Sequence, residues 1–180
     1  MAKAIHLYTR NNDIVKLKDY LFKYNIDINI QCTKKSTALH YASRDKNIEI
    51  MKILLENGAS VNLRNEYATC YPIFEILNST ITENTLPAIK LILEYGVDIL
   101  FTDAFGNTPL HYAVEQENIE LIKLFINYGF DINLTKRDDK DTPLHYAYFQ
   151  KNSTIINLLI KHGANQTLCN IYNKRAKEYL

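Results

Sequence analysis

Three histidines recur in the same local sequence, which makes them the first candidates for chemistry. His40, His111 and His145 each stand in a Leu-His-Tyr-Ala segment. An imidazole can bind a metal ion or exchange a proton near neutral pH. Zinc, however, needs its ligands about 2 Å from one point, whereas packed helices lie about 8–10 Å apart. Histidines on successive helices cannot readily share an ion, and we expect these three to be structural.

The thiols and acidic residues offer no stronger site. Cys32, Cys70 and Cys169 are odd in number and form no Cys-x-x-Cys pair, so we expect reduced thiols rather than a disulfide framework or a zinc site. The acidic cluster within residues 138–141 has too few oxygen ligands for calcium and fits a solvated turn. The sequence contains no Gly-x-Ser-x-Gly, no His-Glu-x-x-His and no Gly-rich phosphate loop. We therefore predict no enzymatic activity, no catalytic residue, no metal and no cofactor.

Charge and hydropathy narrow the class of partner. The 21 basic and 20 acidic side chains give a net charge of +1, whereas proteins that grip a phosphate backbone usually carry a basic face. A tyrosine follows each recurring histidine and could stack on a base, but aromatic residues at repeat-matched spacing more often pack between helices. The N-terminus lacks the apolar core of a secretory signal, and no apolar run reaches the ~18 residues of a membrane-spanning helix. We expect neither nucleic acid nor membrane as a partner, and a cytoplasmic location.

The histidine segments belong to a repeated unit with two predicted helices. Thr108-Pro109 and Thr142-Pro143 precede their histidines, and a Thr N-cap followed by Pro begins a helix. A second block, such as residues 119–126, has apolar residues at helical spacing. A glycine suited to a left-handed C-cap follows this block in four copies, at Gly58, Gly96, Gly129 and Gly163. We expect a short extended stretch after it, at Val61-Asn62, Ile99-Leu100 and Ile132-Asn133.

One copy of the unit is divergent. Tyr71-Pro72-Ile73-Phe74 takes the place of the histidine segment, and four extra residues separate it from its second block. The insertion falls within residues 79–87, and Pro87 fits the first turn of the following helix. Tolerated loop drift and a partner-specific protrusion both remain open explanations for it, since inserts on repeat proteins gather on one face.

The repeated segments resemble the ankyrin repeat family, whose period is about 33 residues and whose signature is Thr-Pro-Leu-His-x-Ala. The resemblance covers nearly the whole chain and implies an all-α fold, a solenoid of stacked helix-turn-helix units with β-hairpin-like loops. In this family the histidine bonds the backbone of adjacent loops. We expect one domain over 1–180, and its divergent, polar ends are typical of capping repeats in a complete array. The expected repeats are 1–33, 34–66, 67–104, 105–137 and 138–170, with a partial C-terminal cap at 171–180.

The same resemblance implies a concave binding face made of hairpin tips and the ends of the first helices. Exposed aromatic side chains are typical anchors of an interface, and we expect this role for Tyr67, Phe105 and Phe149. Basic residues lie toward the N-terminal repeats and acidic ones toward the C-terminal repeats, which predicts a groove with a basic end and an acidic end. The predicted partner-binding residues are Lys34, Arg44, Asp45, Tyr67, Phe105, Asn107, Glu115, Gln116, Asp138, Asp139, Asp141, Phe149 and Gln150.

The leading functional prediction is a monomeric protein-binding module that engages another protein. Small ankyrin-only proteins of this composition are similar to those of intracellular bacteria and large DNA viruses, which implies a host-directed effector, acting in the host cytosol. Two alternatives remain open at this point. The chain could be a stoichiometric inhibitor or regulatory subunit of an enzyme or transcription factor, or an accessory piece of an enzyme encoded elsewhere.

Overall fold

The computed structural model describes residues 2–66 and 70–179, and within them the chain forms helices joined by loops. It divides into two compact units, residues 1–97 and 98–180. The first unit contains α1 (Ala2–Arg10), α2 (Ile14–Lys23), α3 (Ala38–Arg44), α4 (Ile48–Glu56), α5 (Pro72–Leu77) and α6 (Thr85–Glu94). The second contains α7 (Pro109–Glu115), α8 (Ile119–Asn127), α9 (Pro143–Phe149), α10 (Ser153–Lys161) and the short 3₁₀ helix η1 (Ala176–Tyr179).

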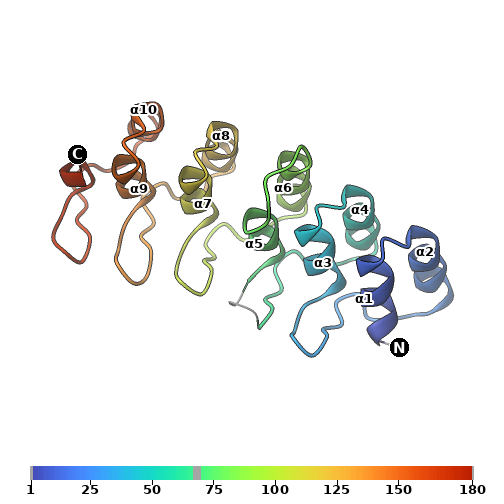
Figure 1. The fold of residues 1–180 in the computed structure, drawn as a ribbon. Coiled ribbons are helices and arrows are strands. Elements are labelled where there is room, and N and C mark those ends of the chain that lie inside the picture. Colours follow the sequence, from blue (N-terminus) through green and yellow to red (C-terminus); the bar gives the residue numbers. More distant parts are fainter. Residues whose placement is uncertain (1, 67–69, 180) are drawn as a thin grey trace. The chain divides into compact units, whose positions relative to one another are not determined.

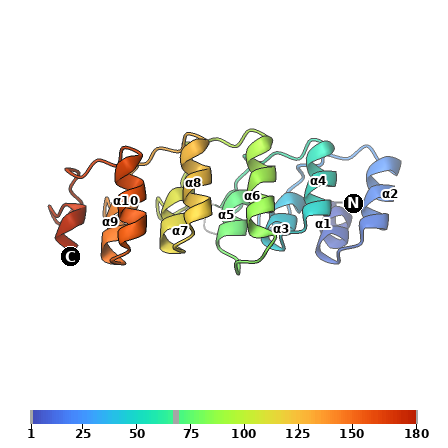
Figure 2. The same cartoon turned by 90° about the horizontal axis from the view of Figure 1, so that it is seen from above.

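Helix pairs stack within each unit, as the repeat predicts. In the first unit α3 packs against both α1 and α5, and α4 packs against α6. In the second unit α7 packs against α9, and α9 packs against η1. The first helices of the pairs lie beside the loops and the second helices form a separate row, which can be followed within each unit in Figure 1 and Figure 2. The apolar faces between the rows are fully buried, for example at Leu39, Ile73, Leu110 and Leu144.

The first helices begin where the Thr-Pro segments predict. Thr37, Thr108 and Thr142 are the N-caps of α3, α7 and α9. Tyr71 takes that place before α5 in the divergent copy, where Pro72 is the first helical residue. The prediction of paired helices with these starting points is confirmed.

The second helices have a cap of their own that the sequence analysis did not identify. The side chain of the residue before the helix accepts a hydrogen bond from a backbone N–H in the first turn, a standard N-cap arrangement. These capping residues are Asp13, Asn47, Asn118 and Asn152. At the other end the four predicted glycines have φ between +77° and +95°, so the left-handed C-cap is confirmed.

The stretch after each second helix was predicted to be extended, and that prediction is wrong. Val61-Asn62, Ile99-Leu100 and Ile132-Asn133 are turns. The cause is a side-chain oxygen that accepts a hydrogen bond from the backbone N–H two residues later. Asp98 Oδ1 accepts from Leu100 N at 2.9 Å, and Asp131 Oδ1 accepts from Asn133 N at 2.8 Å. Short polar side chains of this kind stabilise turns in place of extended backbone.

An asparagine in this turn connects successive repeats. The amide of Asn29 donates to Gly58 O at 3.1 Å and its Oδ1 accepts from Ser60 N at 2.7 Å. Asn133 bonds the corresponding groups, Gly163 O and Asn165 N. Leu100 occupies the same place in the turn that begins the second unit, and its side chain is 72% exposed.

Replacing Leu100 with Asn should therefore stabilise the second unit. The new amide would lie where Asn133 lies in the next turn, within reach of the backbone around Gly129, and would remove an exposed apolar side chain. A net gain of about 1 kcal/mol in the free energy of unfolding is expected from the added hydrogen bonds. Urea unfolding followed by circular dichroism measures it. Leu100→Ala is the control, because it removes the leucine without adding a bridge and should give no comparable gain.

The loops after these turns end in hairpin-like tips, as the fold class predicts. Each tip is closed by a backbone hydrogen bond, such as Cys32 N to Ser36 O at 3.0 Å and Asp103 N to Asn107 O at 3.0 Å. The residue two before the next Thr has positive φ: +52° at Lys35, +82° at Gly106 and +57° at Lys140. Only Gly106 among these lacks a side chain.

Gly106 cannot accept a side chain because the next tip lies against it. A Cβ built there would be 2.3 Å from Arg137 N and 2.6 Å from Arg137 Cβ. Gly106→Ala should lower the free energy of unfolding by about 1–3 kcal/mol more than Gly163→Ala. Gly163 is a matched control, since its φ is +95° and nothing lies within 4 Å of a Cβ there. Equal losses in the two variants, measured by urea unfolding, would contradict the close approach of the tips.

The insertion in the third repeat is held by a buried lysine of the second repeat. Lys46 is 4% exposed and has φ +49°. Its ammonium donates to Ser79 Oγ and to Thr80 O, the latter at 2.7 Å. The extra residues form the link from α5 to α6, and Pro87 lies in the first turn of α6 as predicted. Desolvation lowers the pKa of the Lys46 amine, and the two oxygen acceptors offset part of that cost.

Candidate partner-binding surface

The recurring histidines join the start of one first helix to the tip of the following repeat. The Nε2 atoms of His40 and His111 lie 3.1 Å from Cys70 O and Asp141 O. His6 and His145 make the same contact with Ser36 O and Lys174 O. The Nδ1 atoms of His40, His111 and His145 each accept a hydrogen bond from the backbone N–H of the threonine that caps the same helix, at 3.1–3.2 Å. A ring that accepts at Nδ1 and donates at Nε2 is neutral, and the predicted structural role is confirmed.

Burial keeps these rings uncharged. Desolvation lowers the pKa of His40 to about 4, and desolvation lowers the pKa of His111 to about 4 as well. Carbonyl acceptors at Nε2 act in the opposite direction but do not offset the burial of the imidazole. The His40 and His111 rings are therefore occupied in positioning the tips and are not poised for proton transfer near neutral pH.

The tyrosines that follow the histidines are half-buried rather than packed fully into the core. Tyr41 lies edge-on to His6 with ring centroids 5.9 Å apart, and Tyr146 lies edge-on to His111 at 5.5 Å. The hydroxyl of Tyr112 donates to Asp103 Oδ2 at 2.7 Å, and that of Tyr41 lies 3.4 Å from Cys32 Sγ. Their phenol groups thus face the tips, along the surface where a partner was expected.

In the first unit, tips and first helices enclose a groove of about 830 Å³. Arg10 and Arg44 are the last residues of α1 and α3, and Tyr41 lies on α3. Their guanidinium carbons lie 5.5 and 5.4 Å from the centroid of the Tyr41 ring, within cation–π range. The remaining lining side chains come from the same two kinds of element and are His6, Leu7, Cys32, Thr33, Lys34, Ser36, His40, Asn65 and Glu75.

This groove brings together only part of the predicted site. Lys34 and Arg44 line it, and Asp45 pairs with Arg44, Oδ1 to Nε, at 3.2 Å. Tyr67 lies outside the described residues. Leu7, Asn65 and Glu75 were missed, because their part in the groove depends on which side of a helix or tip faces the neighbouring repeat. The sequence signal that could have found Glu75 is its register, because in the divergent copy it takes the place of the tyrosine that follows each recurring histidine.

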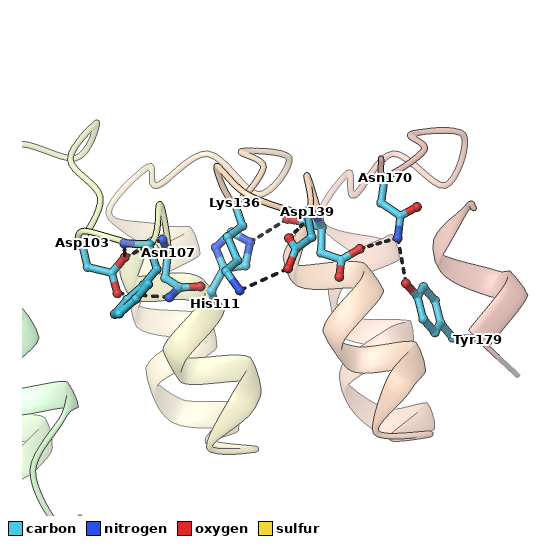
Figure 3. Close-up of polar contacts among 9 residues, drawn as sticks. Asp103, Asn107, His111, Lys136, Asp139, Asn170 and Tyr179 are labelled. Carbon is cyan, nitrogen blue, oxygen red and sulfur yellow. Dashed lines mark hydrogen bonds and ion pairs between the residues drawn. The ribbon is translucent and has the colours of Figure 1, made fainter. Parts of the chain in front are cut away.

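In the second unit two of the predicted acidic residues are bonded to neighbouring side chains, Asp139 within its own tip, as Figure 3 shows, and Asp141 to the next tip. Asp139 pairs with Lys136 at 3.1 Å, and Asp141 accepts from Asn170 Nδ2 at 2.9 Å. Asn170 also donates to the Tyr179 hydroxyl at 2.7 Å. Lys136 and the Asp141 amide hold the pKa of the Asp139 carboxyl below its ordinary value, although burial acts against them.

Asn107 has the same internal role in its tip. Its backbone N–H and its side-chain amide donate to the two carboxylate oxygens of the buried Asp103, at 2.8 and 3.1 Å. Gln150 donates from Nε2 to Glu115 O at 2.9 Å. Gln116, the residue after Glu115, is half-buried. Asp138 and Glu115 keep exposed side chains. The acidic character of this end is therefore weaker than the sequence suggests.

Two of the predicted aromatic anchors are exposed in the second unit. Phe105 is 55% exposed at its tip, and Phe149 is 72% exposed at the end of α9. The Phe149 ring meets the edge of Tyr179 with centroids 6.1 Å apart. Tyr172, at the last tip, is 67% exposed and was not predicted. Exposed aromatic side chains with one supported edge are suited to anchor an interface.

Residues 2–66 and 70–179 offer neither a metal-binding cluster nor a membrane span. That part of the chain contains no group of three or more His, Cys, Asp or Glu side chains placed to hold a metal ion. It also contains no helix with the length and apolar character needed to cross a bilayer. The titratable side chains of the tips are instead bonded to neighbouring side chains, as described above for Asp103, Asp139 and Asp141.

Comparison with known proteins identifies the repeat. Residues 77–170 match the family described as ankyrin repeats in three copies, and residues 21–73 match ankyrin repeats in many copies. An ankyrin repeat protein of Acanthamoeba polyphaga mimivirus is 33% identical over 120 residues, 67% of this chain and 15% of that protein. One from fowlpox virus is 34% identical over 102 residues, 57% of this chain and 16% of that protein. The chain thus matches about a sixth of the length of these relatives.

Structural comparison agrees with the sequence. A crystal structure of an ankyrin repeat domain from Acinetobacter baumannii superposes with a TM-score of 0.85 and 25% identity, covering 97% of this chain and 91% of that one. A Rickettsia felis protein, also named for ankyrin repeats, is 30% identical over 105 residues, 54% of this chain and 46% of that protein. With paired helices, histidine-anchored tips and family matches over most of its length, the chain belongs to the ankyrin repeat family.

Proposed function

We propose that this chain binds a partner protein through the face made by its tips and first helices. Ankyrin repeats are generally protein–protein interaction modules, without catalytic activity of their own. The observation that carries the proposal is the groove of about 830 Å³ on this face in residues 1–97. Its size lies within the range of about 300–1,000 Å³ typical of ligand pockets, and its walls include the exposed side chains of Arg10, Lys34 and Arg44.

The proposed contact residues follow from exposure and placement. Lys34, Arg44 and Asp45 would contact the partner at the groove, and Tyr67 at the neighbouring tip. Phe105, Phe149, Glu115, Gln116, Gln150 and Asp138 would extend the contact in the second unit. Asn107, Asp139 and Asp141 would act mainly by holding the shape of the tips that present these side chains.

Affinity capture from a host lysate, read by mass spectrometry, tests the proposal. A variant with Lys34→Ala, Arg44→Ala and Phe105→Ala should retain its fold and bind the captured partner at least tenfold more weakly. The matched control replaces Lys52, Lys90 and Lys123, exposed lysines at one position of α4, α6 and α8, with alanine. Partner loss in the control but not in the face variant would contradict the proposal. Light scattering on the same preparations tests the proposed monomeric state.

The organisms of the relatives favour a host protein as the partner. The matched proteins come from a mimivirus, fowlpox virus and Rickettsia felis, all of which multiply inside host cells. We therefore propose that the chain acts as a host-directed effector in the host cytosol. Expression of a tagged chain in host cells, followed by fractionation, tests this: recovery of the chain away from the cytosolic fraction would contradict it.

A further inference from the structure

The groove of the first unit concentrates positive charge around one ring. Arg10 and Arg44 lie at 5.5 and 5.4 Å from the Tyr41 centroid, and Lys34 lines the same groove. Within the described residues no carboxylate lies within 4.0 Å of Arg10. Arg44 uses its Nε atom for Asp45 at 3.2 Å, so that its two Nη atoms are not engaged in this ion pair.

The negative groups of the groove do not cancel this charge. Glu75 accepts from Asn65 Nδ2 at 2.8 Å, and burial raises the pKa of its carboxyl. His40, also in the wall, is neutral near pH 7 because burial lowers its pKa to about 4. The groove is lined by Arg10, Lys34 and Arg44 and by one carboxylate, Glu75, in a chain whose total charge is +1. The excess is therefore local to the groove, a pattern typical of electrostatic recognition.

We propose that this groove binds an acidic peptide segment of the partner, with an Asp or Glu carboxylate received by the guanidinium groups of Arg10 and Arg44. Guanidinium groups match carboxylates in geometry, and charge-assisted hydrogen bonds between them are among the strongest in proteins. Contact with the Tyr41 ring limits the rotamers of both arginines before binding, which reduces the entropy that binding must overcome. This inference rests on the proposed protein-binding function and adds the chemistry of the ligand.

A peptide fits the groove better than a nucleic acid. Binding to a phosphate backbone depends on many cations along a face, whereas this groove holds three. Stacking on a base needs an open aromatic face, and the Tyr41 ring is already in contact with two guanidinium groups and with His6.

Selection from a random peptide library on the immobilised full chain tests the ligand class. The bound peptides should be enriched in Asp and Glu, and raising the salt concentration should weaken their binding. For one selected peptide, Arg10→Ala and Arg44→Ala should each weaken binding about 10- to 100-fold, the usual effect of losing a charged hydrogen bond. Thermal unfolding of each variant confirms that the fold is retained.

Arg64→Ala is the matched control for this experiment. Arg64 is an exposed arginine of the same unit whose guanidinium carbon lies 5.6 Å from the Tyr71 centroid, and it does not line the groove. Its replacement should change the affinity by less than about twofold. A single-stranded oligonucleotide of equal net charge is the comparison ligand and should bind far more weakly than the peptide.

Four results would overturn the inference: no selected peptide at all, selected peptides without acidic enrichment, equal losses in Arg44→Ala and Arg64→Ala, or equal binding of the oligonucleotide. The failure of the proposed function is distinguishable from these. The selected peptides could lack acidic residues and still bind the Lys34, Arg44 and Phe105 variant more weakly than the parent chain. That result would support binding of a protein on this face and would exclude only the acidic ligand.

Discussion

Lowering the pH from 7 to 5 should reduce the free energy of unfolding by about 2 kcal/mol for each of two buried histidines, His40 and His111. Both rings are 1% exposed, and desolvation lowers the pKa of each to about 4. An unfolded histidine has a pKa of about 6.5. The stabilisation is therefore complete above about pH 6.5 and is lost as the pH falls toward 4.

The sign follows from proton binding. Between pH 6.5 and 4 the unfolded chain takes up a proton on each of these imidazoles and the folded chain does not, so falling pH favours unfolding. The carboxyls of Glu75 and Asp141 act in the opposite direction, because burial raises their pKa. These two carboxyls therefore offset part of the histidine contribution to the measured change.

Urea unfolding at pH 7, 6 and 5 isolates the effect when His111→Gln is compared with the parent chain. Between pH 7 and 5, the free energy of unfolding of the variant should fall by about 2 kcal/mol less than that of the parent chain. His162→Gln is the control, since His162 is exposed just after α10 and its replacement removes an imidazole that lies outside the core. An identical pH dependence in all three chains would show that the folded state protonates His111 freely.

His111→Ala should lower the free energy of unfolding by about 3–5 kcal/mol at pH 7. The change leaves Asp141 O and Thr108 N without their bonds to the imidazole, at 3.1 and 3.2 Å. Each buried group left unsatisfied costs about 1–3 kcal/mol, and the lost ring volume adds a cavity. Urea unfolding at constant pH measures the total.

The contact with Asp141 also predicts where the damage appears. Without it the tip of residues 136–141, closed by Lys136 N to Asp141 O at 2.9 Å, should exchange its amide hydrogens faster. Tyr112→Phe is the control, because it removes only the hydroxyl that bonds Asp103 at 2.7 Å and should cost about 1 kcal/mol. A loss in His111→Ala no greater than in Tyr112→Phe would contradict the role assigned to the imidazole.

Most of the fold could be predicted because its signals are local. Thr142-Pro143 begins a helix by capping and by a fixed φ, and Gly163 ends the next one by its left-handed backbone; both effects depend on neighbours in the chain. The turns at Val61-Asn62 and Ile132-Asn133 were mistaken for extended chain. Their β-branched residues outweighed, in the prediction, the polar acceptors two residues before the turned N–H groups.

The candidate surface could be predicted only in outline, since it depends on contacts between repeats. The sequence places Arg10, Tyr41 and Arg44 on first helices but does not show that both guanidinium groups reach one ring. It likewise lists Asp139 and Asp141 as acidic without showing that Lys136 and Asn170 bond to them. Net charge along a chain is therefore a poor guide to the charge that a partner meets.

Site-specific photo-crosslinking tests the central proposal, that a partner protein binds the face of tips and first helices. A photoreactive side chain would replace Leu7, which lines the groove and is 53% exposed, or Lys52, which is exposed on α4 of the opposite row. The captured partner should crosslink from position 7 and not from position 52. Crosslinking from position 52 alone would place the partner on the second helices and contradict the account.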